Sequence, residues 1–86
     1  MHELSIAVSL VEAICDELPK LGEVSVRSVR LRIGELSGVV PDALEFAFDV
    51  ATDGSRIAGA QLMIEKTPGR ELELTALEVV DEPANR

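Results

Sequence analysis

Aliphatic residues are spaced in two different ways along this chain, and the change of spacing separates helices from strands. Over residues 3–18 they recur every three or four positions, which gives a helix one wide apolar face. Over residues 24–33 they alternate with polar residues, which is typical of a strand with one buried face. We expect Pro19 and Gly22 to end the helix. A chain with both patterns buries its helix and strand faces against each other.

The second half of the chain predicts another helix and two more strands. Pro41 suits the first turn of a helix, which Asp53-Gly54 is expected to stop. Strands are predicted over residues 60–66 and 72–79. The turn signal Pro68-Gly69 lies between them, so we expect these two strands to form an antiparallel hairpin.

The element order is helix, strand, helix, strand, strand. The first strand can reach the second by a crossover through the second helix, which makes those two strands parallel. The sequence therefore predicts a two-layer α/β (α+β) fold, with a small three-stranded mixed sheet and two helices on one face. The alternation slips by one residue near Ser28 and again near Thr75, which predicts two β-bulges.

Charge and composition exclude several classes of function. The chain has 86 residues, enough for one small domain, and carries 16 acidic residues against 8 basic ones for a net charge of −8. This charge opposes phosphate backbones and anionic lipid, and Phe46 and Phe48 are the only aromatic residues available for stacking bases. We therefore expect neither a nucleic-acid nor a membrane partner.

Cysteine and histidine usage limits the chemistry further. Cys15 is the only cysteine, so there is no internal disulfide and no CxxC zinc site, and a reducing, cytoplasmic location is expected. Cys15 lies on the apolar helix face and is expected to pack in the core rather than bind metal. There is no Ser-His-Asp set, Cys-His pair or phosphate loop, so we do not expect an enzyme.

The amino terminus combines several nitrogen donors. Methionine is normally removed only before a small residue, so Met1 should be retained with its free α-amine beside His2, the only histidine. The α-amine, the His2 amide nitrogen and the His2 imidazole can close two adjacent chelate rings around one ion. Amide nitrogens bind only after losing a proton, which Ni(II) and Cu(II) can drive in a square-planar site. Zn(II) prefers tetrahedral sites and should bind more weakly.

Glu3 has two interpretations. Its carboxylate could orient the imidazole or lend negative charge to a metal site. It could equally be an acidic residue of a first helical turn, which the helix dipole favours. The full donor set, including the Glu3 amide, stays open.

The chain resembles the HypA/HybF family of hydrogenase nickel-incorporation proteins over nearly its whole length. The matching stretches are M-H-E-L-S-I-A at residues 1–7, R-L-R-I-G-E-L-S-G-V at 30–39, P-D-A-L-E-F-A-F at 41–48, L-M-I-E-K-T-P-G-R at 62–70 and L-E-L-T-A-L-E-V at 72–79. The resemblance implies a Ni(II)-binding metallochaperone with its nickel site at Met1, His2 and Glu3. It also implies nickel delivery to the large subunit of [NiFe]-hydrogenase with the GTPase HypB, and some relatives serve urease.

One departure from the family is large. Its members carry a zinc domain with two CxxC pairs between the second and third strands, whereas here Arg70 runs straight into Glu71. We therefore expect residues 1–86 to be a nickel-binding domain that lacks the zinc domain and binds no zinc, through either an engineered or a natural loss. A short, strained connection could also exchange strands between chains and give a domain-swapped homodimer.

A second class of function stays open beside the nickel carrier. The first helix is apolar over more than one side, so the chain could be a metal-free protein-interaction or dimerisation module of a maturation complex. A tag before Met1 separates the two hypotheses, because it should weaken nickel binding and leave docking through the helix unchanged.

Overall fold

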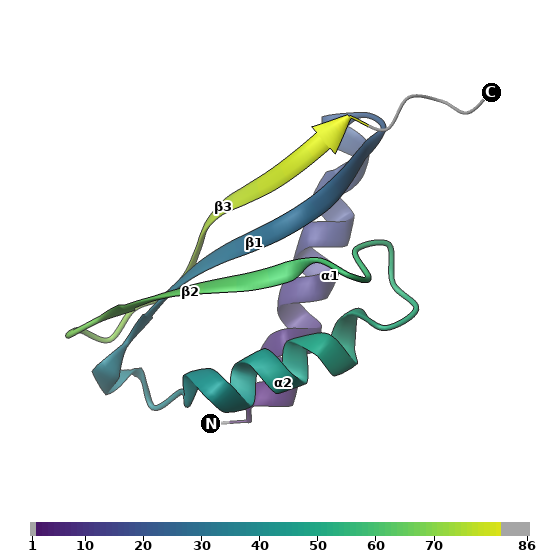
Figure 1. The fold of residues 1–86 in the computed structure, drawn as a ribbon. Helices are drawn as coiled ribbons and strands as arrows, with labels where there is room; N and C mark the ends of the chain where they lie inside the picture. The colour runs from purple at the N-terminus through teal and green to yellow at the C-terminus, as the bar shows by residue number, and fades with distance from the viewer. Residues whose placement is uncertain (1, 82–86) are drawn as a thin grey trace.

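The computed structural model describes residues 2–81 and confirms the predicted element order and fold class (Figure 1). The elements are α1 (Glu3–Leu21), β1 (Val24–Gly34), a short 3-10 helix η1 (Glu35–Ser37), α2 (Pro41–Thr52), β2 (Gln61–Thr67) and β3 (Leu72–Asp81). Both helices cover the same face of a three-stranded sheet. Within residues 2–81, neither helix is long and apolar enough to span a bilayer.

The core lies between the two helices and the inner face of the sheet. Its least exposed large side chains are Phe48, Ile14, Leu18, Ile33, Leu44, Ile57 and Val29. On the outer face of the sheet, Arg32 lies between Glu65 and Glu73, with N–O distances of 3.4 and 3.2 Å. The alternation of aliphatic and charged residues along β1 therefore separates a buried face from a charged one.

β1 is the central strand, and this corrects the predicted hairpin. The strand order is β2-β1-β3, with β2 parallel and β3 antiparallel to β1. The parallel pairing of β1 and β2 was expected, but β2 and β3 lie on opposite edges and do not pair with each other. The side chains of β1 that face the helices are buried under both of them. β1 therefore takes the central position, where both of its edges pair with another strand.

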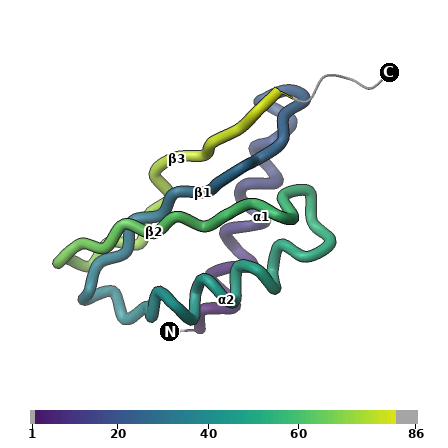
Figure 2. Tube along the Cα trace, viewed as in Figure 1, coloured from purple at the N-terminus to yellow at the C-terminus, as the bar shows by residue number. Residues whose placement is uncertain are grey.

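The connection from β2 to β3 passes across the end of β1 (Figure 2). The Gly34 amide donates to the Glu71 carbonyl and the Leu36 amide to the Gly69 carbonyl, both at 2.8 Å. A Cβ atom at Gly34 would overlap the Gly69 carbonyl. Pro68-Gly69 thus reverses the chain as predicted, but the reversal carries it over β1 to the far edge because Gly34 leaves room for it.

Both predicted β-bulges are present in the β1–β3 pairing. Val26 and Ser28 face the consecutive residues Val79 and Glu78, which leaves Arg27 as the extra residue of β1. On β3 the extra residue is Thr75, whose hydroxyl donates to the Arg30 carbonyl at 3.2 Å. A phase slip in an alternating pattern was therefore a reliable signal of a bulge here.

α1 is longer than predicted. It continues through Pro19 to Leu21 and ends at Gly22, whose φ of 86° is favourable only for glycine. Pro19 lies in the last turn, where its missing amide costs a single hydrogen bond. Leu18, which is only 1% exposed, holds this turn against the core. The expectation that Pro19 helps to end the helix was wrong.

Candidate functional site

His2 is placed immediately outside α1 and is accessible to solvent. Its backbone is extended (φ −88°, ψ 102°), and its carbonyl accepts the first hydrogen bond of the helix from the Ile6 amide at 3.2 Å. The imidazole makes no helix-capping hydrogen bond and is exposed. Met1, the other predicted nitrogen source, lies outside the described residues. His2 is therefore able to turn its ring towards a ligand.

Glu3, the first residue of α1, ties this helix to α2. One of its carboxylate oxygens accepts a hydrogen bond from the Val40 amide at 3.1 Å. Val40 precedes α2, whose first residue, Pro41, has no amide hydrogen. The Val40 amide is therefore available to donate a hydrogen bond at the start of α2. Figure 1 shows the start of α1 lying beside α2.

The position of Glu3 is also favourable electrostatically. Its carboxylate lies at the positive amino-terminal ends of both α1 and α2. The Val40 hydrogen bond, with a smaller contribution from the amide of Glu3 itself, lowers the pKa of this carboxyl below its ordinary value. A lowered pKa means that the contact stabilises the fold above the ordinary carboxyl pKa and is lost as the pH falls through the lower, folded-state value.

The structure gives the Glu3 carboxylate a hydrogen-bond partner outside the predicted metal site. The carboxylate accepts its hydrogen bond from the backbone amide of Val40, which lies in a loop distant in sequence, and not from the imidazole of His2. It therefore positions the first turn of α1, while its negative charge remains next to His2. Sequence reasoning did not identify Val40 as a partner. The available signal was the proline at position 41, which marks a helix amino terminus in need of an anionic partner.

Side-chain donors alone do not make a metal site within residues 2–81. No group of three or more His, Cys, Asp or Glu side chains in this part of the chain could hold an ion. Cys15 is partly buried against the core, as expected, and lies about 20 Å from His2 along the helix axis at 1.5 Å per residue. A metal at His2 would therefore depend on backbone nitrogens and the α-amine.

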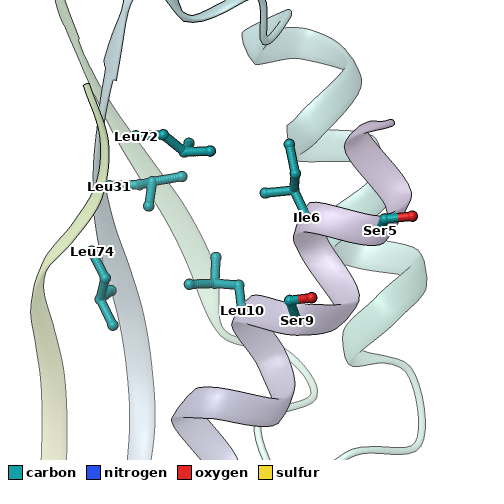
Figure 3. Close-up of a pocket in the computed structure, with 7 residues that line it drawn as sticks. All are labelled: Ser5, Ile6, Ser9, Leu10, Leu31, Leu72 and Leu74. Atoms are coloured by element: carbon teal, nitrogen blue, oxygen red, sulfur yellow. The ribbon is translucent and has the colours of Figure 1, made fainter. Parts of the chain in front are cut away.

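A second surface feature lies next to the first turns of α1. An open groove of about 430 Å³ separates α1 from β3, and Figure 3 shows Ile6 and Leu10 of α1 pointing across it towards the leucines of the sheet. It is lined by Ser5, Ile6, Ser9, Leu10, Leu31, Leu72 and Leu74. The lining is mostly aliphatic and contains no charged side chain.

Comparison with known proteins identifies the family. The family model for HypA, described as a hydrogenase/urease nickel incorporation metallochaperone, matches residues 1–79. The chain belongs to the HypA family. The description of the HypA family names a metallochaperone and not an enzyme. The match begins at residue 1, so Met1, His2 and Glu3 all lie within it.

Several curated HypA relatives are similar in sequence. Hydrogenase maturation factor HypA of Solidesulfovibrio magneticus is 54% identical over 68 residues, which are 79% of this chain and 58% of that protein. HypA of Roseiflexus sp. is 57% identical over 68 residues, 79% of this chain and 55% of the relative. HypA of Streptomyces avermitilis is 46% identical over 71 residues, 81% of this chain and 54% of the relative. The chain thus spans little more than half the length of these relatives.

The fold matches a solved HypA structure as well. The solution structure of the Ni metallochaperone HypA from Helicobacter pylori superposes with a TM-score of 0.77. The match covers 95% of this chain and 100% of that chain at 24% sequence identity. At this identity the similarity establishes the shared fold.

Proposed function

We propose that this HypA-family chain carries Ni(II) at Met1, His2 and Glu3 for [NiFe]-hydrogenase maturation. In this proposal it delivers the ion to the hydrogenase large subunit in partnership with a HypB-type GTPase. The observation that carries the proposal is the family match over residues 1–79, which includes the amino-terminal motif. The exposed position of His2 outside α1 supports it.

The local backbone suits a nitrogen-rich nickel site. His2 is the N-cap of α1 and Glu3 its first residue, so their amide hydrogens have no carbonyl partner within the helix. Deprotonating such an amide breaks no helical hydrogen bond. The α-amine, the His2 amide and the His2 imidazole can then form adjacent chelate rings in the square-planar geometry that Ni(II) favours. We propose Ni(II) as the cargo on this chemistry.

We also propose that this chain lacks the family's zinc domain between Arg70 and Glu71. The chain covers only 54–58% of the length of the three relatives above. The turn at this point is closed, since the Gly69 and Glu71 carbonyls both accept hydrogen bonds from the end of β1 and η1. We therefore expect this chain to bind nickel without a zinc site of its own.

A blocked amino terminus tests the nickel proposal. We expect the protein with a free Met1 amine to bind one Ni(II) at micromolar Kd or tighter in a calorimetric titration, about −8 kcal/mol. A Gly-Ser extension before Met1 moves the α-amine away from His2, so it should weaken binding at least tenfold. Equal binding by both forms would exclude the amine as a donor. Binding by neither would favour the metal-free interaction module.

Neutralising Glu3 tests its contribution of charge. Two positive helix ends oppose a bound cation, and the Glu3 carboxylate offsets them. Glu3→Gln keeps an oxygen that can accept the Val40 hydrogen bond but loses the charge. We expect its nickel affinity to fall by about tenfold, the lower end of the range for residues that support metal ligands.

Glu3→Ala is the matched variant, because it removes the hydrogen bond as well as the charge. It should bind nickel no more tightly than Glu3→Gln and should also unfold at a lower temperature. Calorimetry and thermal melting of both variants measure the two contributions separately. Wild-type nickel affinity in Glu3→Gln would show that the carboxylate serves only to hold α1 against α2.

A further inference from the structure

β3 presents a long strand edge. Within residues 2–81 it pairs with β1 alone, which leaves its other edge without a hydrogen-bonded partner. The strand is ten residues long and contains no lysine or proline. The features of β3 that oppose edge-to-edge pairing are the bulge at Thr75 and its three acidic residues, Glu73, Glu78 and Asp81. Its apolar side chains remain exposed: Leu72 38%, Leu74 41%, Val79 36% and Val80 39%. Such an edge is a template for another strand.

The groove described above opens beside this edge. Leu72 and Leu74 form its β3 wall, and Ile6 and Leu10 face them from α1 (Figure 3). The side chains of β3 that face the helices are those paired with buried residues of β1, as in Leu74 with Leu31. Although the chain carries a net charge of −8, the groove lining has no charged residue. A strand with an apolar, uncharged face fits this surface best.

We infer that a second copy of this chain docks here, with the two β3 strands antiparallel across a two-fold axis. The two sheets then become one six-stranded sheet. In the favoured register, Leu74 of one copy lies opposite Val79 of the other, and both side chains face the helix layer. Val79 of each copy then covers the open mouth of its partner's groove. This inference does not depend on nickel binding.

The charges of β3 select this register. Thr75 is the extra residue of the bulge, so it is left out of the pairing. Pairing Leu74 with Val79 then places Leu77 opposite Leu77 of the other copy. The same register places Glu78 opposite Ala76 and Glu73 opposite Val80. No glutamate then faces another, and Asp81 at the end of each strand lies opposite Leu72 of the other copy.

The neighbouring registers are less favourable. A two-residue slide, the smallest that keeps helix-facing side chains opposite one another, places Glu73 opposite Glu78 in one direction. A slide in the other direction places Glu78 opposite Glu78 of the other copy. Like charges repel in both of these arrangements. Because each copy is acidic overall, the dimer should tighten as salt screens the repulsion between copies.

Two complementary charge variants test the contact. Leu74→Lys and Val79→Glu each place two unpaired charges in a dimer of identical copies. We expect the wild type to form dimers at tens of micromolar in sedimentation velocity, and each variant to have a dimer Kd at least tenfold higher. An equimolar mixture should recover dimers of one copy of each. In this mixed dimer, the lysine introduced at position 74 of one copy faces the glutamate introduced at position 79 of the other. The other of the two symmetric contacts keeps Leu74 against Val79.

The controls separate this result from misfolding and from strand exchange. Val50→Glu adds a charge at a 52% exposed position of α2, away from the groove, and should leave the dimer intact. Thermal melting checks that each variant folds. A wild type that stays monomeric at all concentrations and salt levels would overturn the inference. So would a dimer that persists in both single variants, since its contact would lie elsewhere, as in a domain-swapped form.

Discussion

His2→Ala is expected to weaken nickel binding by at least a hundredfold, about 2.7 kcal/mol. The substitution removes the imidazole and one of the two chelate rings, and leaves only amine and amide nitrogens. It should not destabilise the fold, because the His2 side chain is exposed and makes no capping hydrogen bond to α1. Calorimetric titration measures the loss, and an unchanged melting temperature shows that the folded domain is intact.

Cys15→Ala provides the matched comparison for His2→Ala. Cys15 is partly buried against the core and lies about 20 Å from His2 along α1, too far for both to bind one ion. Nickel affinity should stay at the wild-type value in this variant. If instead Cys15→Ala lost nickel binding and His2→Ala kept it, the metal site would have to be moved to the middle of α1.

Gly34→Ala should produce the largest loss of stability among single-methyl additions to this chain. The added Cβ would overlap the carbonyl of Gly69 and crowd the amide of Arg70, both backbone groups that cannot rotate away. The turn must then lift from β1 and break the hydrogen bonds made by Gly34 and Leu36. We expect the free energy of unfolding to fall by about 3 kcal/mol. For a domain of this size that lowers the melting temperature by roughly 12–24 °C.

Gly54→Ala separates steric overlap from backbone strain. Gly54 has a φ of 76° and open space around its Cα, so the variant costs only the left-handed conformation, about 1–2 kcal/mol. Gly34 has a φ of −83°, which any residue adopts, so the cost there comes from the overlap. Chemical denaturation of both variants gives the two costs. A smaller loss at Gly34 than at Gly54 would mean that the 67–71 turn is not held against β1.

Local patterns predicted most of the elements because they depend on neighbouring residues. The helical spacing predicted one apolar face of α1, made by Leu4, Ala7, Val8, Val11, Ile14, Cys15 and Leu18. Ala7, Val11, Ile14 and Leu18 are buried, whereas Leu4 and Val8 are 51% and 41% exposed. Pro41 marked the first residue of α2. The slips in alternation located the two bulges. A proline in the last turn of α1 was misleading, because its cost was outweighed by the burial of Leu18 next to it.

The candidate site was predictable only in part. The motif Met1-His2-Glu3 could be found from its position and from the resemblance to a family that the comparisons confirm. The hydrogen bond from Val40 to Glu3 could not, since 37 residues separate its two partners. Sequence spacing does not indicate which helix ends meet in the folded chain. The Glu3 contact is a consequence of packing α1 against α2.

The sequence by itself determined the element order, the two-layer class and the family. These follow from periodicity and from motifs that are read along the chain. Only the tertiary structure decided that β1 is central, that the turn after β2 crosses the end of β1, and that β3 is left as an open edge beside an apolar groove. A turn signal specifies that the chain reverses. Which strand it then pairs with depends on long-range burial and on the space that Gly34 leaves for another backbone.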